Sequence, residues 1–204
     1  MKTKIRIRAL SVLLAMLLVS MVIVPVSADS TTFLDEMGGK EVSAGEWLEI
    51  FDPDYLSTLT DDQKAQLNAM KVTVPDLSQD VVKKSGTVEA EGDSKIIYTA
   101  ISNADIAPMP LGINWLANTK GSCIFPEMHV AATLYYSSDE SSWEEVDNGS
   151  DAGYFTSFVE TSNVEWFPST GYYKVISSHM GTFPAGATPS TYSQILMTGS
   201  MYYS

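Results

Sequence analysis

Cysteine, histidine and arginine are scarce in this sequence of 204 residues. Cys123 is the only cysteine, so no disulfide can form within the chain and stability must come from packing. We interpret Cys123, between Ser122 and Ile124, as a small buried hydrophobic residue, with a reactive thiol or an intermolecular disulfide as the alternative. The histidines, His129 and His179, and this cysteine lack the spacing of a zinc site, so we expect no zinc centre.

Long hydrophobic runs are absent except near the N-terminus, where residues 1–28 have the composition of a signal peptide. Residues 9–26 are apolar apart from two serines and a proline, and small residues precede the junction between Ala28 and Asp29. Four basic residues open this segment: Lys2, Lys4, Arg6 and Arg8. We predict cleavage between Ala28 and Asp29 and a secreted or cell-surface protein. An uncleaved membrane anchor is the alternative, because a run of roughly 18 apolar residues approaches the length of a spanning helix.

Positive charge is nearly missing from the 176 residues that follow the predicted cleavage site. They contain no arginine and eight lysines against 25 acidic residues, which gives a net charge of −17. Only Lys83 and Lys84 are adjacent, whereas nucleic acids and anionic membrane surfaces require clustered basic residues. We therefore expect an acidic protein of one domain with no nucleic-acid partner and, after cleavage, no membrane partner.

The hydrophobic pattern divides the mature chain near Ser85. Residues 29–84 form a helical N-terminal segment, in which Asp52 followed by Pro53 predicts that one helix ends and another begins. Thr60 and Gln63 form a capping box that predicts a third helix. Apolar residues at helical spacing would line the buried face: Trp47, Leu48, Phe51, Tyr55, Leu56 and Leu59. We expect these helices to lie against a sheet, although a pro-segment removed at residues 83–86 is an alternative.

Residues 85–204 have the pattern of an antiparallel β-sandwich, immunoglobulin-like, with about seven strands separated by turns. Within residues 128–136, alternation predicts a buried face on Met128 and a semi-polar face on His129. Asn148 and Gly149 predict a turn over residues 147–151, and with Ser150 they form a glycosylation sequon. The strand candidates are residues 87–89, 95–101, 109–115, 128–136, 143–146, 154–163, 171–181 and 194–203.

Residues 132–200 resemble the small secreted β-sandwich proteins of Gram-positive bacteria and some methanogens. The resemblance covers roughly a third of the chain and implies a fold and an extracellular location, with no activity to carry over. It depends on a strand-turn-strand unit and on a later aromatic strand, with these residues: Leu134, Ser138, residues 143–146, Gly171, Tyr172, Tyr173, Val175, His179 and Ser193.

The residue types of this chain are relevant to three kinds of functional site. A serine near His179 suggests a hydrolase, but no nucleophile motif or carboxylate spacing supports a catalytic triad, so we predict no catalytic residues. Six acidic residues crowd one predicted hairpin, and we interpret them as a solvated turn rather than a calcium site. They are Asp139, Glu140, Glu144, Glu145, Asp147 and Asp151. We expect no metal site and no cofactor.

The third kind of functional site is a sugar-binding face made of aromatic side chains. Flat rings can stack on sugars, and this small β-rich domain contains Trp115, Trp143 and Trp166. We interpret these three tryptophans as packing residues. The sequence therefore predicts a non-enzymatic binding or structural protein whose ligand-binding residues and partners it does not specify. A module that binds carbohydrate, cell wall or surface polysaccharide is one alternative, and a secreted hydrolase that uses carboxylates is another.

Overall fold

The computed structural model describes residues 30–79 and 83–204. The predicted signal peptide, including its cleavage site at Ala28 and Asp29, lies outside the described residues. Within the described part no helix is both long enough and apolar enough to cross a lipid bilayer. The predicted fold class is confirmed: the protein is mainly β, its sheets are antiparallel, and its helices precede the main sheet.

The main sheet has seven strands, and every pairing is antiparallel. Its hydrogen-bonded order is β3-β4-β5-β7-β8, with β6 on the other edge of β5 and β9 beside the start of β7. The bounds are β3 Ser85–Glu91, β4 Ile97–Met109, β5 Gly112–Ser137, β6 Glu144–Trp166, β7 Gly171–Thr182, β8 Thr191–Met197 and β9 Met201–Tyr203. A short 3₁₀ turn, η1 (Asp93–Lys95), joins β3 to β4.

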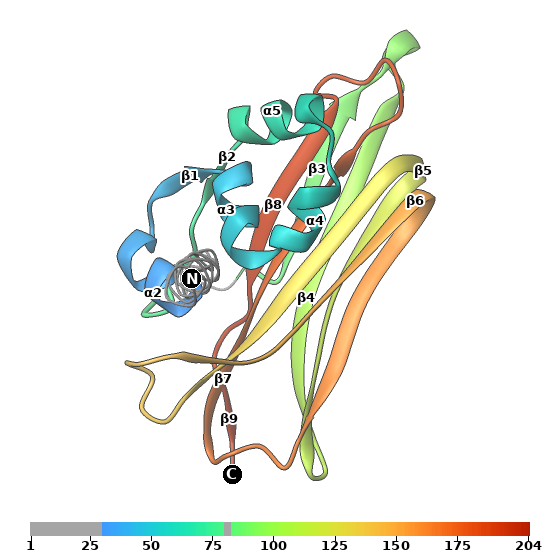
Figure 1. Ribbon diagram of the computed structural model, residues 1–204. Helices are drawn as coiled ribbons and strands as arrows, with labels where there is room; N and C mark the ends of the chain where they lie inside the picture. Colours follow the sequence, from blue (N-terminus) through green and yellow to red (C-terminus); the bar gives the residue numbers. More distant parts are fainter. Residues whose placement is uncertain (1–29, 80–82) are drawn as a thin grey trace, which may run out of the picture.

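Strands β5 and β6 fold back on themselves, which turns one sheet into two layers (Figure 1). The first part of β5 pairs with β4, the second part pairs with β7, and the register shifts between Lys120 and Phe125. The bend of β6 brings the N–H of Glu160 to 3.3 Å from the carboxylate of Asp151 in the same strand. Bulged strands that pass from one layer to the other are a recognised way to form the corner of a sandwich.

The bend in β5 depends on Gly121. A Cβ atom at this position would lie 2.4 Å from the ring of Phe125, which is closer than real carbon atoms approach. Phe125 is fully buried between the layers with Trp115 and Tyr192. The bend therefore brings a large core side chain over a position that has no side chain of its own.

A helical cover packs on the outer face of one layer. It consists of α2 (Ser30–Met37), α3 (Ala44–Phe51), α4 (Pro53–Thr58) and α5 (Asp61–Ala69), with a small sheet of β1 (Glu41–Ser43) and β2 (Lys71–Thr73). Figure 1 shows α3, α4 and α5 grouped on one side of the strands. Apolar residues of this cover share a second core with Tyr135, Trp143 and Ile176. As predicted, these helices lie against the sheet.

The predicted helix boundaries are confirmed by their caps. Asp52 ends α3 and caps α4, accepting a hydrogen bond from the Tyr55 N–H at 2.9 Å, with Pro53 in the first turn. Thr60 and Gln63 form the predicted capping box at the start of α5. Helix α2 and the β1–β2 pair were not predicted, because both are short and carry a weak periodic signal.

Several predictions about strands, a turn and the burial of a strand face are wrong in detail. The predicted strand at 109–115 straddles a turn at Pro110 and Leu111, and the predicted turn at 147–151 lies inside β6, where Asn148 pairs with Thr133. The predicted strand at 194–203 is divided between β8 and β9. The predicted semi-polar face of residues 128–136 is buried, because the helical cover packs on it.

Candidate functional site

His179, which with a nearby serine suggests a hydrolase, contacts two hydroxyl groups. The Ser177 hydroxyl lies 2.8 Å from Nε2 of His179, and the Thr119 hydroxyl lies 2.8 Å from its Nδ1. A catalytic triad would place a carboxylate at Nδ1, and here a neutral hydroxyl takes that place. His179 is 0 % exposed, and this burial, with a small contribution from His129, lowers the pKa of His179 to about 3. A neutral, enclosed ring cannot reach a substrate, so this cluster joins β7 to the first part of β5 within the protein interior.

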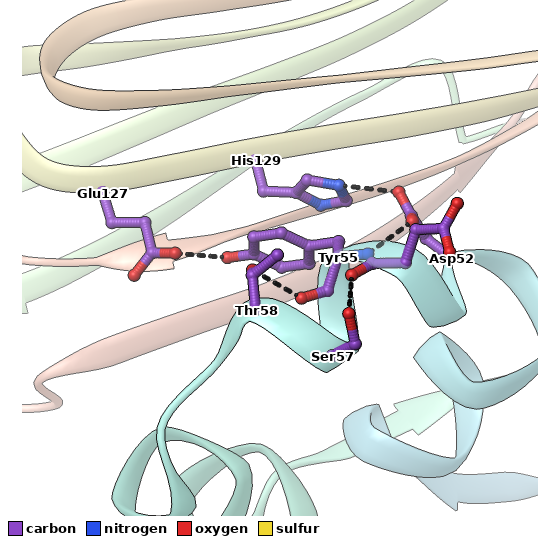
Figure 2. A network of polar contacts seen from close by, with 7 residues as sticks. Asp52, Tyr55, Ser57, Thr58, Glu127 and His129 are labelled. Atoms are coloured by element: carbon purple, nitrogen blue, oxygen red, sulfur yellow. Dashed lines mark hydrogen bonds and ion pairs between the residues drawn. The ribbon is translucent and has the colours of Figure 1, made fainter.

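The second histidine belongs to a network that links the helical cover to β5 (Figure 2). Nε2 of His129 lies 3.0 Å from the Asp52 carboxylate, and the Tyr55 ring stacks on the imidazole at 3.7 Å between centroids. The Tyr55 hydroxyl donates to Glu127 at 2.9 Å, and the Gln63 side-chain amide donates to the same carboxylate at 2.6 Å. The helical cover therefore contacts Glu127 and His129 of β5. The contacts come from α4, from the residue that caps α4, and from α5.

The electrostatics of this network keep Asp52 ionised. Burial raises the pKa of the Asp52 carboxyl, but hydrogen bonds from His129 and from the Tyr55 N–H outweigh burial and hold the pKa below its ordinary value. Burial and the adjacent Glu127 charge raise the pKa of Tyr55 far above its ordinary value, so its hydroxyl stays a donor. An ionised Asp52 accepts, so Nε2 of His129 must carry a proton. Nδ1 of His129 is buried and has no hydrogen-bond partner among the described residues.

Two cavities flank Asp52 where α4 meets the outer face of the β5–β6 hairpin, and we call them together the Asp52 groove. The first has a volume of about 450 Å³ and extends from Ser30 to Ser150, with Glu145 and Thr133 in its wall. The second has a volume of about 420 Å³. Asp52, Asp54 and Ser150 line both cavities, and the second is completed by these residues: Tyr55, Thr58, His129, Asp151, Ala152 and Tyr154. No lysine or arginine is among the described residues that line the groove.

Another cavity, of about 470 Å³, lies between β2 and β8. It is bordered by Gln79 and Lys83, the residues on either side of the segment 80–82 that the structure does not describe. We therefore assign no site to it.

The acidic residues that suggested calcium do not gather around one point. The Asp139 carboxylate accepts hydrogen bonds from the N–H groups of Ser141 and Ser142, and Asp147 accepts from Nε1 of Trp115 at 2.8 Å. Glu145 accepts from the Ser30 hydroxyl at 2.6 Å. Within residues 30–79 and 83–204, no group of three or more His, Cys, Asp or Glu side chains is placed to hold a metal ion.

The aromatic residues divide into packing residues and exposed ones. Trp115 and Trp143 are buried, as predicted for packing residues, whereas Trp166 is 56 % exposed at the end of β6. The exposed ring in the Asp52 groove is Tyr154, with 61 % exposure, next to Phe155 at the bend of β6. Cys123 is half-buried at the bend of β5 and packs against the core between the layers.

Sequence patterns place Asp52, Tyr55 and Gln63 in the helical segment, but they do not predict that these residues meet on β5. Glu127, the residue that Tyr55 and Gln63 contact, has no role in the sequence analysis. The isolated position of Glu127, an acid immediately before a strongly apolar strand, was a signal of a buried partner.

The chain matches no family model, and no curated protein and no solved structure matches it. The resemblance of residues 132–200 to small secreted β-sandwich proteins therefore stays a prediction.

Proposed function

We propose that this protein is an exported, non-enzymatic binding protein that holds its ligand in the Asp52 groove. One observation carries the proposal: two adjoining cavities share Asp52, Asp54 and Ser150 at the junction of the helical cover and the sheet. Concave sites with a few convergent polar groups are typical of ligand binding. The buried hydrogen bonds that Asp52 and Tyr55 make to β5 would hold the walls of the groove in place without a ligand.

The chemistry of the groove favours binding over hydrolysis. A hydrolase that uses two carboxylates needs one carboxylic acid whose pKa is raised, so that it can donate a proton. The Asp52 carboxyl, which lines both cavities, accepts hydrogen bonds from His129 and the Tyr55 N–H, and these lower its pKa, so Asp52 is not such an acid. Ser177 and His179 could resemble a nucleophile and its base, but both side chains are buried in the interior and cannot reach a substrate.

The proposed location depends on residues 1–28, whose basic start, apolar run and small residues before Asp29 are typical of a cleaved signal peptide. Sequencing the N-terminus of the protein recovered outside its producing cells tests this. We expect the chain to begin at Asp29, and a chain that begins at Met1 would contradict cleavage.

The proposed binding function is tested by retention on cell-wall and surface-polysaccharide fractions. Ser150→Trp places a bulky ring at an exposed position that lines both cavities, and we expect it to abolish retention. Ser157→Trp is the matched control, since Ser157 is an exposed serine of the same strand that lines neither cavity. Equal retention of both variants would remove the groove from the proposal, and hydrolysis of a retained polymer would contradict a non-enzymatic role.

A further inference from the structure

The Asp52 groove has one carboxylate with no partner. Asp52 and Glu145 are occupied by His129 and Ser30, and Asp151 accepts a long hydrogen bond from the backbone N–H of Glu160. The Asp54 carboxylate is exposed and accepts no hydrogen bond from any described residue, although Asp54 lines both cavities. With no lysine in the lining, the groove presents uncompensated negative charge, which attracts a cation.

The wall of the second cavity contains a buried nitrogen that has no hydrogen-bond partner among the described residues. His129 is 1 % exposed, lines this cavity and directs its Nε2 proton to Asp52. The other ring nitrogen, Nδ1, is buried and has no hydrogen-bond partner among the described residues. Buried polar groups are ordinarily paired, so this nitrogen points to a partner from outside the chain, and a hydroxyl group suits it because a hydroxyl can both donate and accept.

The remaining lining is suited to a polyhydroxylated molecule. The hydroxyl oxygens of Thr58 and Ser150 lie in the same wall as three carboxylates, and all of these oxygens can accept hydrogen bonds from sugar hydroxyls. Tyr154 adds an exposed aromatic ring at this cavity, and its flat face can pack on apolar C–H groups.

We infer that the Asp52 groove binds an amino sugar, with the protonated amine near Asp54 and Asp151 and the sugar ring beside Tyr154. This inference rests on the proposed binding function and specifies its ligand class. After the predicted cleavage site the protein has eight lysines against 25 acidic residues, and an amino-sugar polymer of a cell wall or surface would supply the opposite charge.

The test compares oligomers of glucosamine with oligomers of N-acetylglucosamine of the same length, by calorimetric titration at mildly acidic pH and low salt. The two ligands share their ring and hydroxyls and differ in the charge of one nitrogen. We expect the glucosamine oligomer to bind about fivefold more tightly, as one exposed ion pair contributes up to about 1 kcal/mol. Asp54→Asn should remove most of this preference for the charged oligomer, and Asp105→Asn, at an exposed acid of β4 outside the groove, is its control.

The possible outcomes separate the inference from the proposed function. Equal binding of both oligomers, abolished by Ser150→Trp, would overturn the role of the amine and keep the groove as a sugar site. Equally tight binding of a lysine oligopeptide would show selection for charge alone and overturn the sugar class. If neither oligomer binds, but the protein is retained on a polysaccharide fraction and Ser150→Trp abolishes that retention, the ligand class is wrong and the proposed function stands. If the protein neither binds an oligomer nor is retained on a polysaccharide fraction, the inference and the proposed function are both wrong.

Discussion

The carboxylate of Asp52 lies 3.0 Å from Nε2 of His129, although 77 positions separate the two residues in the chain. The same carboxylate caps α4 through the Tyr55 N–H, so one side chain both begins a helix and attaches that helix to the sheet. This double contact fixes the place where the helical cover meets β5. The groove therefore forms between the helical N-terminal segment and the β-rich segment, which are far apart in the sequence.

Replacement of Asp52 by asparagine should reduce stability at neutral pH by about 1–3 kcal/mol, since His129 would lose an ionised acceptor. The pKa of Asp52 is lower in the folded than in the unfolded protein, so its contribution is complete above the unfolded value and is lost as the pH falls through the folded value. Urea unfolding of wild type and Asp52→Asn should therefore give curves that differ most at pH 7 and approach each other as the pH falls below the ordinary pKa of an aspartic acid. Asp54→Asn is the control, because Asp54 is an exposed acid of α4. Its unfolding curves should match those of wild type at every pH measured.

Removal of the Tyr55 hydroxyl should destabilise the protein by about 1–3 kcal/mol, because buried Glu127 would lose a hydrogen-bond donor. Tyr55→Phe keeps the ring and its stacking on His129, so packing is unchanged and the loss reports the hydroxyl. Tyr202→Phe is the control, since that hydroxyl is exposed and makes no hydrogen bond within the described chain. Similar midpoints for the two variants in chemical denaturation would contradict a structural role for the Tyr55–Glu127 bond.

His179 should make stability depend on pH between about 6.5 and about 3. Burial lowers its folded pKa to about 3, whereas in the unfolded chain it titrates near 6.5, so in this interval the unfolded state binds the extra proton. Stability should consequently decrease as the pH falls, with a slope from this residue of at most about 1.4 kcal/mol per pH unit. NMR of the folded protein should show no titration of the His179 ring from pH 7 to 5, and His179→Gln should reduce the slope. A ring that titrates near pH 6.5 would contradict its enclosure.

Gly121→Ala should destabilise the protein by about 1–3 kcal/mol, the usual cost of overpacking a core, because the new Cβ would overlap the Phe125 ring. The paired change Gly121→Ala with Phe125→Leu removes the atoms that are overlapped. It should therefore be less destabilising than the sum of the two single changes, as measured by a double-mutant cycle of unfolding free energies. Additive effects would mean that the bend tolerates a side chain at residue 121.

Local signals explain the successful predictions for this chain. The break between α3 and α4 follows from Asp52 and Pro53, and the start of α5 follows from Thr60 and Gln63, because caps involve residues three apart. Alternation from Met128 to Leu134 correctly places one set of side chains between the two layers. These features depend on neighbours in the chain, so they can be read without the fold.

The failures occur where a distant segment changes the environment. Asn148 and Gly149 have the composition of a turn, yet they pair with β5 because the long hairpin continues through them. The His129 face looks semi-polar in isolation and is buried because the helical cover packs over it. No periodic pattern indicates that β5 and β6 would each fold back and supply strands to both layers.

The sequence by itself determined the acidic charge, the absence of intramolecular disulfides, the helix caps and the mainly β character. Each of these depends on composition or on residues close together in the chain. Tertiary structure alone decided that His179 is enclosed, that His129 meets Asp52, and that Asp54, Ser150 and Tyr154 share one groove. The physical reason is that burial and hydrogen-bond partners belong to the packed chain. They arise when the cover lies on the folded-back hairpin and excludes water from the residues between them.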